Sequence, residues 1–205
     1  MSPQSRRPGA VAPHLRSSTH LADLVADLGA FEPVDAQQDA LRAAMLEFAE
    51  AHPDALHRSC GDGHFTGSAL VVEQRTGRVL LLLHTKLRKW LQPGGHTDGE
   101  ANLALTALRE ATEETGISNL VVVPGPIDLD IHEVRPPAEP PHLHHDIRYL
   151  VVAAHGAEPV GNHESQSLRW FTPDEISELD VDESVLRLVR RGLEAAASVP
   201  QVQLS

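Results

Sequence analysis

The hydrophobic pattern divides the chain into a polar start, a helical section and a longer section of strands. Residues 1–18 mix Pro, Ser, Arg and Gly without periodicity, which predicts a flexible tail outside the fold. Apolar residues then recur at helical spacing over 21–28 and 35–51, with Asp35 placed as the N-cap of the second helix. We therefore expect an N-terminal helical elaboration over residues 19–60.

Strand-like apolar runs after this section predict a β-rich domain over residues 61–200. A hairpin is expected from strands 65–73 and 78–84, which flank a turn that ends at Gly77. Further strands are predicted at 120–123, 127–134, 147–154 and 166–171. Helices are predicted at about 100–115 and at about 182–196. A short helix is predicted between the last strand and the final helix, with Thr172 as its N-cap. Mixed strands with flanking helices favour an α/β or α+β sandwich.

Composition narrows the choice of partners and compartment. The formal net charge is −12, and because binding to a nucleic-acid backbone needs clustered Lys and Arg, no nucleic-acid partner is expected. No apolar run approaches the roughly 18 residues that cross a bilayer, and no secretory signal follows Arg6 and Arg7. The single Cys60 fits a reducing compartment. We expect a protein without a membrane partner and with a cytoplasmic location.

One side of the predicted helix 100–115 carries three glutamates. At about 100° per residue, Glu113 and Glu114 lie about −60° and +40° from Glu110. An apolar stripe lies opposite them and is expected to pack on the sheet: Leu105, Leu108, Ala111, Thr112 and Thr115. Like charges at this spacing repel mildly unless a cation bridges them, and Mg²⁺ prefers oxygen ligands. A divalent-cation site and a solvated acidic face both fit the glutamates alone.

The residues around the glutamates favour the cation site. The segment Gly-Gly-His-Thr-Asp-Gly-Glu at 94–100, followed by Arg-Glu-Ala-Thr-Glu-Glu-Thr-Gly-Ile at 109–117, closely resembles the Nudix box, G-x5-E-x7-R-E-U-x-E-E-x-G-U with U aliphatic. The match runs from Gly95 to Ile117. Ala101 stands where the box has its first glutamate and Glu100 comes one residue early, so Glu100 and Asp98 are secondary candidates for that role.

The resemblance implies a fold, an activity and a set of site residues. The fold would be a Nudix-type α/β/α sandwich with a mixed β-sheet. The activity would be pyrophosphohydrolysis, the cleavage of a diphosphate linkage in a small nucleotide-like substrate, either a nucleoside diphosphate derivative or a nucleoside triphosphate. By resemblance, Glu110, Glu113, Glu114 and the Gly94 carbonyl would bind Mg²⁺ or Mn²⁺, while Arg109 would brace the loop through charge-assisted hydrogen bonds.

Residues outside the box are candidates for the remaining roles. Glu164 resembles a late loop glutamate of the family and is proposed as the general base or an extra metal ligand, with an exposed loop acid as the alternative. Lys86, Arg88 and Lys89 form a local basic cluster suited to substrate phosphates, with a solvated surface as the alternative. Strand alternation places His144 and Asp146 on one face, together with His142, where they could line the substrate cleft. A zinc site from these histidines lacks a fourth ligand at recognised spacing.

Two other functions are weighed against the hydrolase. A non-catalytic nucleotide-sensing module would keep the fold but could lose its metal-binding acids, and Glu110, Glu113 and Glu114 are all present. An isoprenoid diphosphate isomerase of this fold would need a catalytic cysteine, for which Cys60 has no evident match. The N-terminal helices have two candidate roles, covering the substrate cleft or forming a homodimer contact.

Overall fold

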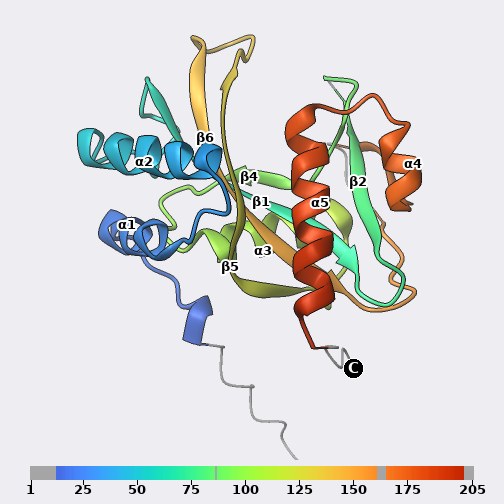
Figure 1. Ribbon diagram of the computed structural model, residues 1–205. Helices are drawn as coiled ribbons and strands as arrows, with labels where there is room; N and C mark the ends of the chain where they lie inside the picture. The colour runs from blue at the N-terminus through green and yellow to red at the C-terminus, as the bar shows by residue number, and fades with distance from the viewer. Residues whose placement is uncertain (1–12, 86, 161–164, 201–205) are drawn as a thin grey trace, which may run out of the picture.

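A computed structural model describes residues 13–85, 87–160 and 165–200 and shows a mixed β-sheet between two layers of helices (Figure 1). One face of the sheet packs against α1 (Leu21–Ala30), α2 (Ala36–Ala51) and α3 (Leu103–Thr115). The opposite face packs against α4 (Pro173–Ser177) and α5 (Glu183–Ser198). The predicted α/β/α sandwich is confirmed.

The sheet is built around β1 (Gly63–Glu73), which is buried along its whole length. The strand order is β3-β2-β1-β6-β5, and β4 also pairs with β1 while β7 pairs with β2. The other strands are β2 (Arg78–His84), β3 (Trp90–Leu91), β4 (Gly94–His96), β5 (Val121–Val134), β6 (His142–Ala153) and β7 (Ser165–Phe171). β1 and β6 run parallel and the remaining pairs are antiparallel, which makes the sheet mixed.

Side-chain alternation on β1 assigns its residues to two separate cores. Phe65 and Val71 lie in the core beneath α1, α2 and α3, whereas Leu70 and Val72 lie in the core beneath α5. Successive side chains of a strand point to opposite faces, and helices cover both faces here. The apolar run at 69–72 of β1 follows from this double burial.

The predicted N-terminal helices are present and are joined to the sheet. Asp35 caps α2 as expected, since its Oδ1 accepts a hydrogen bond of 2.8 Å from the backbone nitrogen of Gln38. The buried Gln38 side chain then exchanges two hydrogen bonds with the backbone of Leu129, at 2.9 and 2.8 Å. These bonds hold the start of α2 against β5.

Several element boundaries differ from the predictions. The strands predicted at 120–123 and 127–134 are one strand, β5, whose register against β6 shifts on either side of Pro126. β6 begins at His142 rather than 147, because its histidine-rich start pairs with both β1 and β5. The short strands β3 and β4 were not predicted, and α3 begins at Leu103 rather than near residue 100.

The predicted tail was wrong for residues 13–18, which contact the start of α3. Residues 13–15 form a 3-10 turn, and the backbone nitrogen of Ala101 donates to the carbonyl of Ser18 at 2.7 Å. The side chain of Asn102 donates to the carbonyls of His14 and Arg16, at 2.8 and 3.0 Å. In the part of the chain that the structure describes, no helix is both long and apolar enough to span a membrane.

Candidate active site

A cleft of about 870 Å³ lies between the sheet and the acidic side of α3. Glu110 and Glu114 of α3 line it together with Gly94 and Gly95 of β4. It is also lined by residues of three other strands: Thr66 and Ser68 of β1, His132 of β5, and His144 and Asp146 of β6. Two of the three predicted glutamates therefore share one cavity with the glycine pair.

The glycine pair lets the backbone of β4 approach the glutamates closely. The backbone nitrogen of Gly94 donates to Oε2 of Glu114 at 3.0 Å. A Cβ atom at Gly95 would lie only 2.6 Å from the carboxyl carbon of Glu110, and one at Gly94 would lie 2.2 Å from Oγ of Ser68. Larger residues at either position would displace the groups that form the cleft wall.

The burial of α3 differs in part from the predicted apolar stripe. Ala111 and Thr115 are buried as expected, whereas Leu105 and Leu108 are half-buried. Leu103 and Thr106 are buried although they lie on the side of the glutamates, because the first turns of α3 pack closely on Gly67 of β1. Because of these contacts, only the second half of α3, which carries Glu110 and Glu114, faces the cleft with its acidic side.

Arg109 connects the acidic side of α3 to the backbone of β4. Its Nη1 lies 2.6 Å from Oε1 of Glu110 and 3.8 Å from Oε2 of Glu113, and its Nη2 donates to the carbonyl of His96 at 2.7 Å. These contacts fit the predicted bracing role. Glu113 differs from its neighbour in exposure: its side chain is 59% exposed, against 14% for Glu110, and it does not line the described cleft.

The donor set fits a hard divalent cation. Glu110 and Glu114 bring carboxylate oxygens to one cavity, and Mg²⁺ and Mn²⁺ prefer carboxylate, carbonyl and water oxygens. Mg²⁺ usually keeps several waters and binds through one or two carboxylates plus substrate phosphates, so two or three glutamates suffice. An open cleft beside them leaves room for both water and phosphate.

Glu100 lies outside the cleft and holds the N-terminal segment against α3. Its carboxylate accepts hydrogen bonds from the backbone nitrogen of Ser18 at 2.9 Å, from the Ser17 hydroxyl at 2.5 Å, and from the backbone nitrogen of Asn102 at 2.8 Å. Ala101, in the place of the box's first glutamate, is fully buried in the apolar core. The departure from the Nudix box thus coincides with a structural contact to residues 17 and 18.

Asp146 forms part of the cleft floor and is almost fully buried. It accepts hydrogen bonds from Thr66 Oγ1 at 2.9 Å, Ser68 Oγ at 2.8 Å and Arg148 Nε at 2.7 Å. Its carboxylate is therefore fixed by the protein itself. His144 also lines the cleft. Its burial, and to a smaller extent the neighbouring His64, lower the pKa of its imidazole to about 2, which keeps the ring neutral.

The other predicted site residues are less well placed, or lie outside the described part. Lys86 and Glu164 fall outside the residues that the structure describes. Arg88 is exposed in the turn between β2 and β3, with a φ of 58°, and does not line the described cleft. Their roles stay predictions.

Several cleft residues were missed by the sequence analysis. Thr66 and Ser68 alternate on β1 and could have been identified as polar residues within an otherwise apolar strand. Arg58, which was also missed, forms an ion pair of 2.9 Å with Asp98, a secondary candidate of the sequence analysis that lines the cleft, and both side chains are more than half exposed. Partial burial raises the pKa of Asp98, but the hydrogen bond from Arg58 outweighs it and holds the pKa below its ordinary value. No sequence spacing links residues 58 and 98, so only the fold could reveal this pair.

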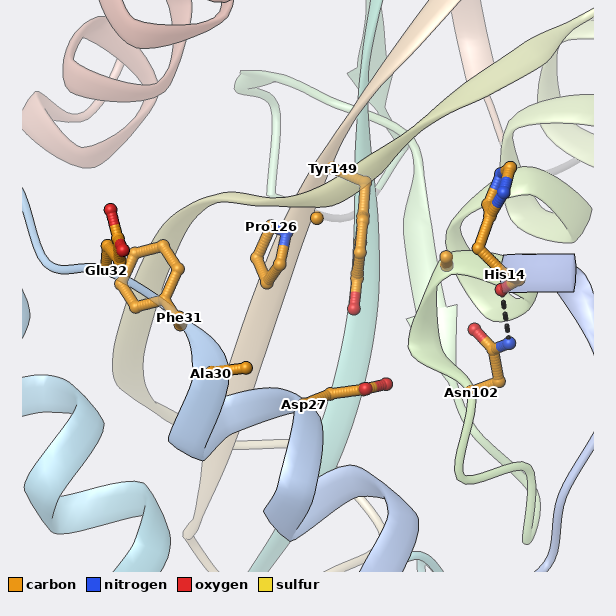
Figure 2. Close-up of a pocket in the computed structure, with 10 residues that line it drawn as sticks. His14, Asp27, Ala30, Phe31, Glu32, Asn102, Pro126 and Tyr149 are labelled. Atoms are coloured by element: carbon orange, nitrogen blue, oxygen red, sulfur yellow. Dashed lines mark hydrogen bonds between the residues drawn. The ribbon is translucent and has the colours of Figure 1, made fainter.

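A second cavity of about 490 Å³ lies on the other side of α3's first turn, between α1, Pro126 and Tyr149 (Figure 2). The hydrogen bond between Asn102 and the carbonyl of His14 lies at its edge. Asp27 points into it, and its partial burial together with the nearby Asp23 raises the pKa of its carboxyl group. The glutamates of α3 do not line this cavity, which separates it from the candidate active site.

Comparisons with known proteins point to one family. The NUDIX domain model matches residues 63–191, and no curated protein sequence matches the chain. A NUDIX family hydrolase from Clostridium perfringens has 25% identity and a TM-score of 0.55, with 64% of this chain and 97% of that chain covered. A C. elegans Ap4A hydrolase has 17% identity and a TM-score of 0.54, with 66% and 98% covered. An E. coli dihydroneopterin triphosphate pyrophosphohydrolase has 16% identity and a TM-score of 0.50, with 64% and 95% covered.

Proposed function

Because this chain belongs to the NUDIX domain family of hydrolases, we propose that it cleaves a diphosphate linkage in a nucleoside diphosphate derivative or a nucleoside triphosphate, with Mg²⁺ or Mn²⁺ as cofactor. The observation that carries the proposal is the arrangement of Glu110 and Glu114 beside the glycine pair in one open cleft. The names of the similar structures support the substrate class, since one is an Ap4A hydrolase and another a dihydroneopterin triphosphate pyrophosphohydrolase. At 16–17% identity they do not select a substrate.

The chain's own residues would prepare the site for phosphate chemistry. Glu110, Glu113 and Glu114, with the Gly94 carbonyl, would hold the cation, which when bound supplies charge neutralisation for phosphate oxygens and an acidified water. The Gly94 amide holds the Glu114 carboxylate in place, and Arg109 holds Glu110 and the β4 backbone together. This positioning reduces the reorganisation that the reaction would otherwise need.

The water that attacks the phosphate needs a proton acceptor. Glu164 keeps this role as a prediction from sequence. A pH profile of Glu164→Gln would test it: the variant should lose activity mainly at neutral pH and recover part of it at higher pH, and an unchanged profile would exclude Glu164 as the base.

Two alternative functions are less well supported. An isoprenoid diphosphate isomerase would need a cysteine at the substrate, but Cys60 is buried near His52 and is not among the residues that line the described cleft. Burial also raises the pKa of its thiol, which disfavours the thiolate. A sensing module would bind nucleotides without turnover, and the retained glutamates favour the hydrolase over it.

A release assay over a substrate panel tests the proposal. The full chain would be incubated with nucleoside triphosphates, dinucleoside polyphosphates and nucleotide sugars, each with Mg²⁺, with Mn²⁺ and with a chelator, and phosphate and pyrophosphate release would be measured. We expect metal-dependent release from at least one class. If a nucleotide raises the melting temperature but no member is cleaved, the sensing module replaces the hydrolase.

A further inference from the structure

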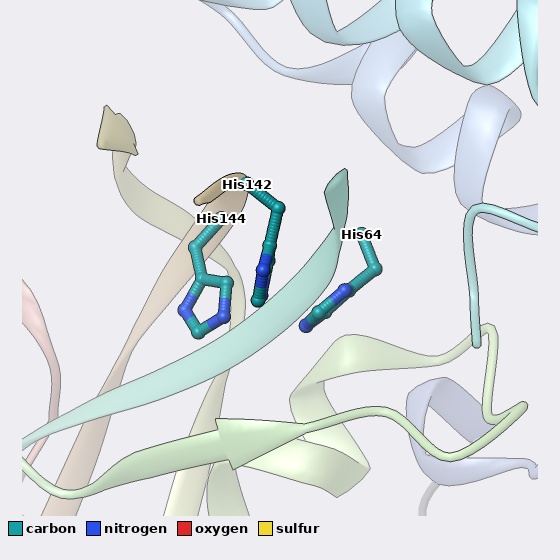
Figure 3. A group of neighbouring side chains, drawn as sticks. All are labelled: His64, His142 and His144. Atoms are coloured by element: carbon teal, nitrogen blue, oxygen red, sulfur yellow. The ribbon is translucent and has the colours of Figure 1, made fainter. Parts of the chain in front are cut away.

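Three histidines converge beside the cleft, apart from the glutamates. The rings of His64, His142 and His144 point toward one another from β1 and β6 (Figure 3). Their ring centroids are 4.8 to 5.4 Å apart, and one nitrogen from each lies within 4.8 Å of the others. His64 is 1% exposed and His142 is 8% exposed. A cluster of three imidazoles in such a buried place calls for a chemical explanation.

The register of the sheet creates this cluster. His142 and His144 are two residues apart on β6, so their side chains share one face. β1 runs parallel to β6 with His64 directly beside His144, which places the third ring on the same face. Sequence spacing alone shows only the first two histidines, because His64 is 78 positions before His142 in the chain.

His64 has no hydrogen-bond partner among the described residues. Both of its ring nitrogens, Nδ1 and Nε2, are buried and unpaired. Buried polar groups of folded proteins almost always have a partner, which can be protein, water or a metal ion. One neutral imidazole nitrogen carries a lone pair, and the His64 ring faces two further imidazoles without a hydrogen bond to either of them.

The partner of His142 prepares that ring to bind a metal. Nδ1 of His142 lies 2.9 Å from the carbonyl of Pro140, and only a protonated nitrogen can bond a carbonyl oxygen. This bond leaves the lone pair on Nε2. Metal-binding histidines usually have such a partner on the other nitrogen, where it fixes both tautomer and ring orientation.

We propose that His64, His142 and His144 form a binding site for a transition-metal ion of the zinc class, separate from the carboxylate site of α3. Neutral imidazoles suit Zn²⁺, Co²⁺, Ni²⁺ and Cu²⁺, whereas Mg²⁺ prefers oxygen ligands. Three protein ligands leave one position of a tetrahedral ion open, as in catalytic zinc sites. His144 also lines the substrate cleft, so an open position on that side would accept a phosphate oxygen or water.

The ligands would have to close slightly around the ion. Nitrogens bound at about 2.0–2.1 Å in a tetrahedron are about 3.4 Å apart, less than the 4.8 Å that encloses the cluster. Rotation of the His144 ring, which faces the cleft, is one way to close this gap. Two further histidines, His96 and His132, lie edge-on to His144 with ring centroids 5.5 Å away and do not belong to the cluster of three.

Cobalt binding measured by visible absorption tests the site. The full chain, purified without a polyhistidine tag and stripped with a chelator, would be titrated with Co²⁺ in excess Mg²⁺, which occupies carboxylates but does not compete for imidazoles. We expect one equivalent of Co²⁺ to bind with the absorption of a nitrogen-rich site, and Zn²⁺ to displace it. His64→Gln and His144→Gln should each weaken binding by at least about a hundredfold.

Matched variants separate this site from the carboxylate site and from general effects. His20→Gln changes an exposed histidine and should bind Co²⁺ unchanged, and so should Glu114→Gln if the two sites are separate. His144→Gln keeps the test decisive if His64→Gln does not fold. Absence of Co²⁺ binding in excess Mg²⁺, or wild-type affinity for Co²⁺ in both histidine variants, would overturn the proposal and leave water as the partner of His64. Neither outcome bears on the proposed hydrolysis.

Discussion

The two acidic clusters of this protein differ in burial. Asp128, Asp130 and Asp146 lie in the sheet, and the first and last are almost fully buried. The glutamates of α3 lie at an open cleft, with Glu113 largely exposed. Ionised groups can be buried only when they are paired, whereas exposed ones can keep their hydration. An acidic cluster therefore indicates a site for a ligand only when its burial and partners are known.

The buried cluster is matched by three arginines of the protein itself. Asp128 contacts all of them: Arg148 at 3.2 Å, Arg187 at 2.9 Å and Arg191 at 2.8 Å. Arg191 also contacts Asp35, the N-cap of α2. The network joins β5, β6, α5 and α2, so we expect it to stabilise the fold, whereas the glutamates of α3 are proposed to hold a cation. Variants in the two clusters should accordingly affect different properties.

The largest effect is expected from Asp128→Asn. The change keeps the volume but leaves three buried guanidinium groups without their shared carboxylate, so the free energy of unfolding should fall by about 3–5 kcal/mol. Urea denaturation would measure the fall. Asp39→Asn removes the partner of Arg42 in an exposed i,i+3 pair on α2 and should cost at most about 0.5 kcal/mol. Equal losses in both variants would remove the distinction between buried and exposed acids.

Glu114→Gln should lower turnover but leave stability nearly unchanged, unlike Asp128→Asn. It keeps the side-chain volume but removes a carboxylate of the proposed cation site, so kcat should fall at least about a hundredfold while the unfolding free energy changes by less than about 0.5 kcal/mol. Kinetics on the substrate found in the release assay, with denaturation in parallel, would measure both. Glu47→Gln, at an exposed position of α2, is the matched control and should leave both unchanged. Normal turnover would remove α3 from the mechanism.

Gly95→Ala should move a carboxylate without removing it. The added methyl group would lie 2.6 Å from the Glu110 carboxyl carbon, and a flexible glutamate can turn away at little cost in stability. Because small displacements of catalytic groups are costly, kcat should fall by at least about tenfold. Gly61→Ala, which meets no atom within 4 Å, should have normal turnover. Full activity of Gly95→Ala would show that the position of Glu110 is not critical.

The sequence predicted the elements of this fold well where local patterns determine them. The period of the apolar residues located both N-terminal helices, and Asp35 was identified as an N-cap from its place before α2. The histidine-rich start of β6 was missed, because its strand structure comes from pairing with β1 and β5 rather than from apolar alternation. The fully buried side chain of Arg148 could not be predicted either, since its acidic partners lie on two strands.

The candidate site, too, could be predicted only where its residues lie close together in the sequence. The glutamates of α3 follow from helical spacing and the box motif, both local in sequence. The pairing of Arg58 with Asp98 and the approach of His64 to His144 depend on register between distant segments. The role of Glu100 was open for this reason: its partners, Ser17 and Ser18, lie 83 and 82 positions away.

The smallest effect is expected from Glu100→Ala, which tests whether this residue replaces the missing box glutamate. Its carboxylate serves the backbone nitrogens of Ser18 and Asn102, so its loss should lower the unfolding free energy by about 1 kcal/mol, as for other lost helix caps. Turnover should stay within about twofold of wild type, because Glu100 does not line the described cleft. Denaturation and kinetics on one preparation would separate the two effects. A hundredfold loss of kcat with unchanged stability would instead place Glu100 with the glutamates of α3.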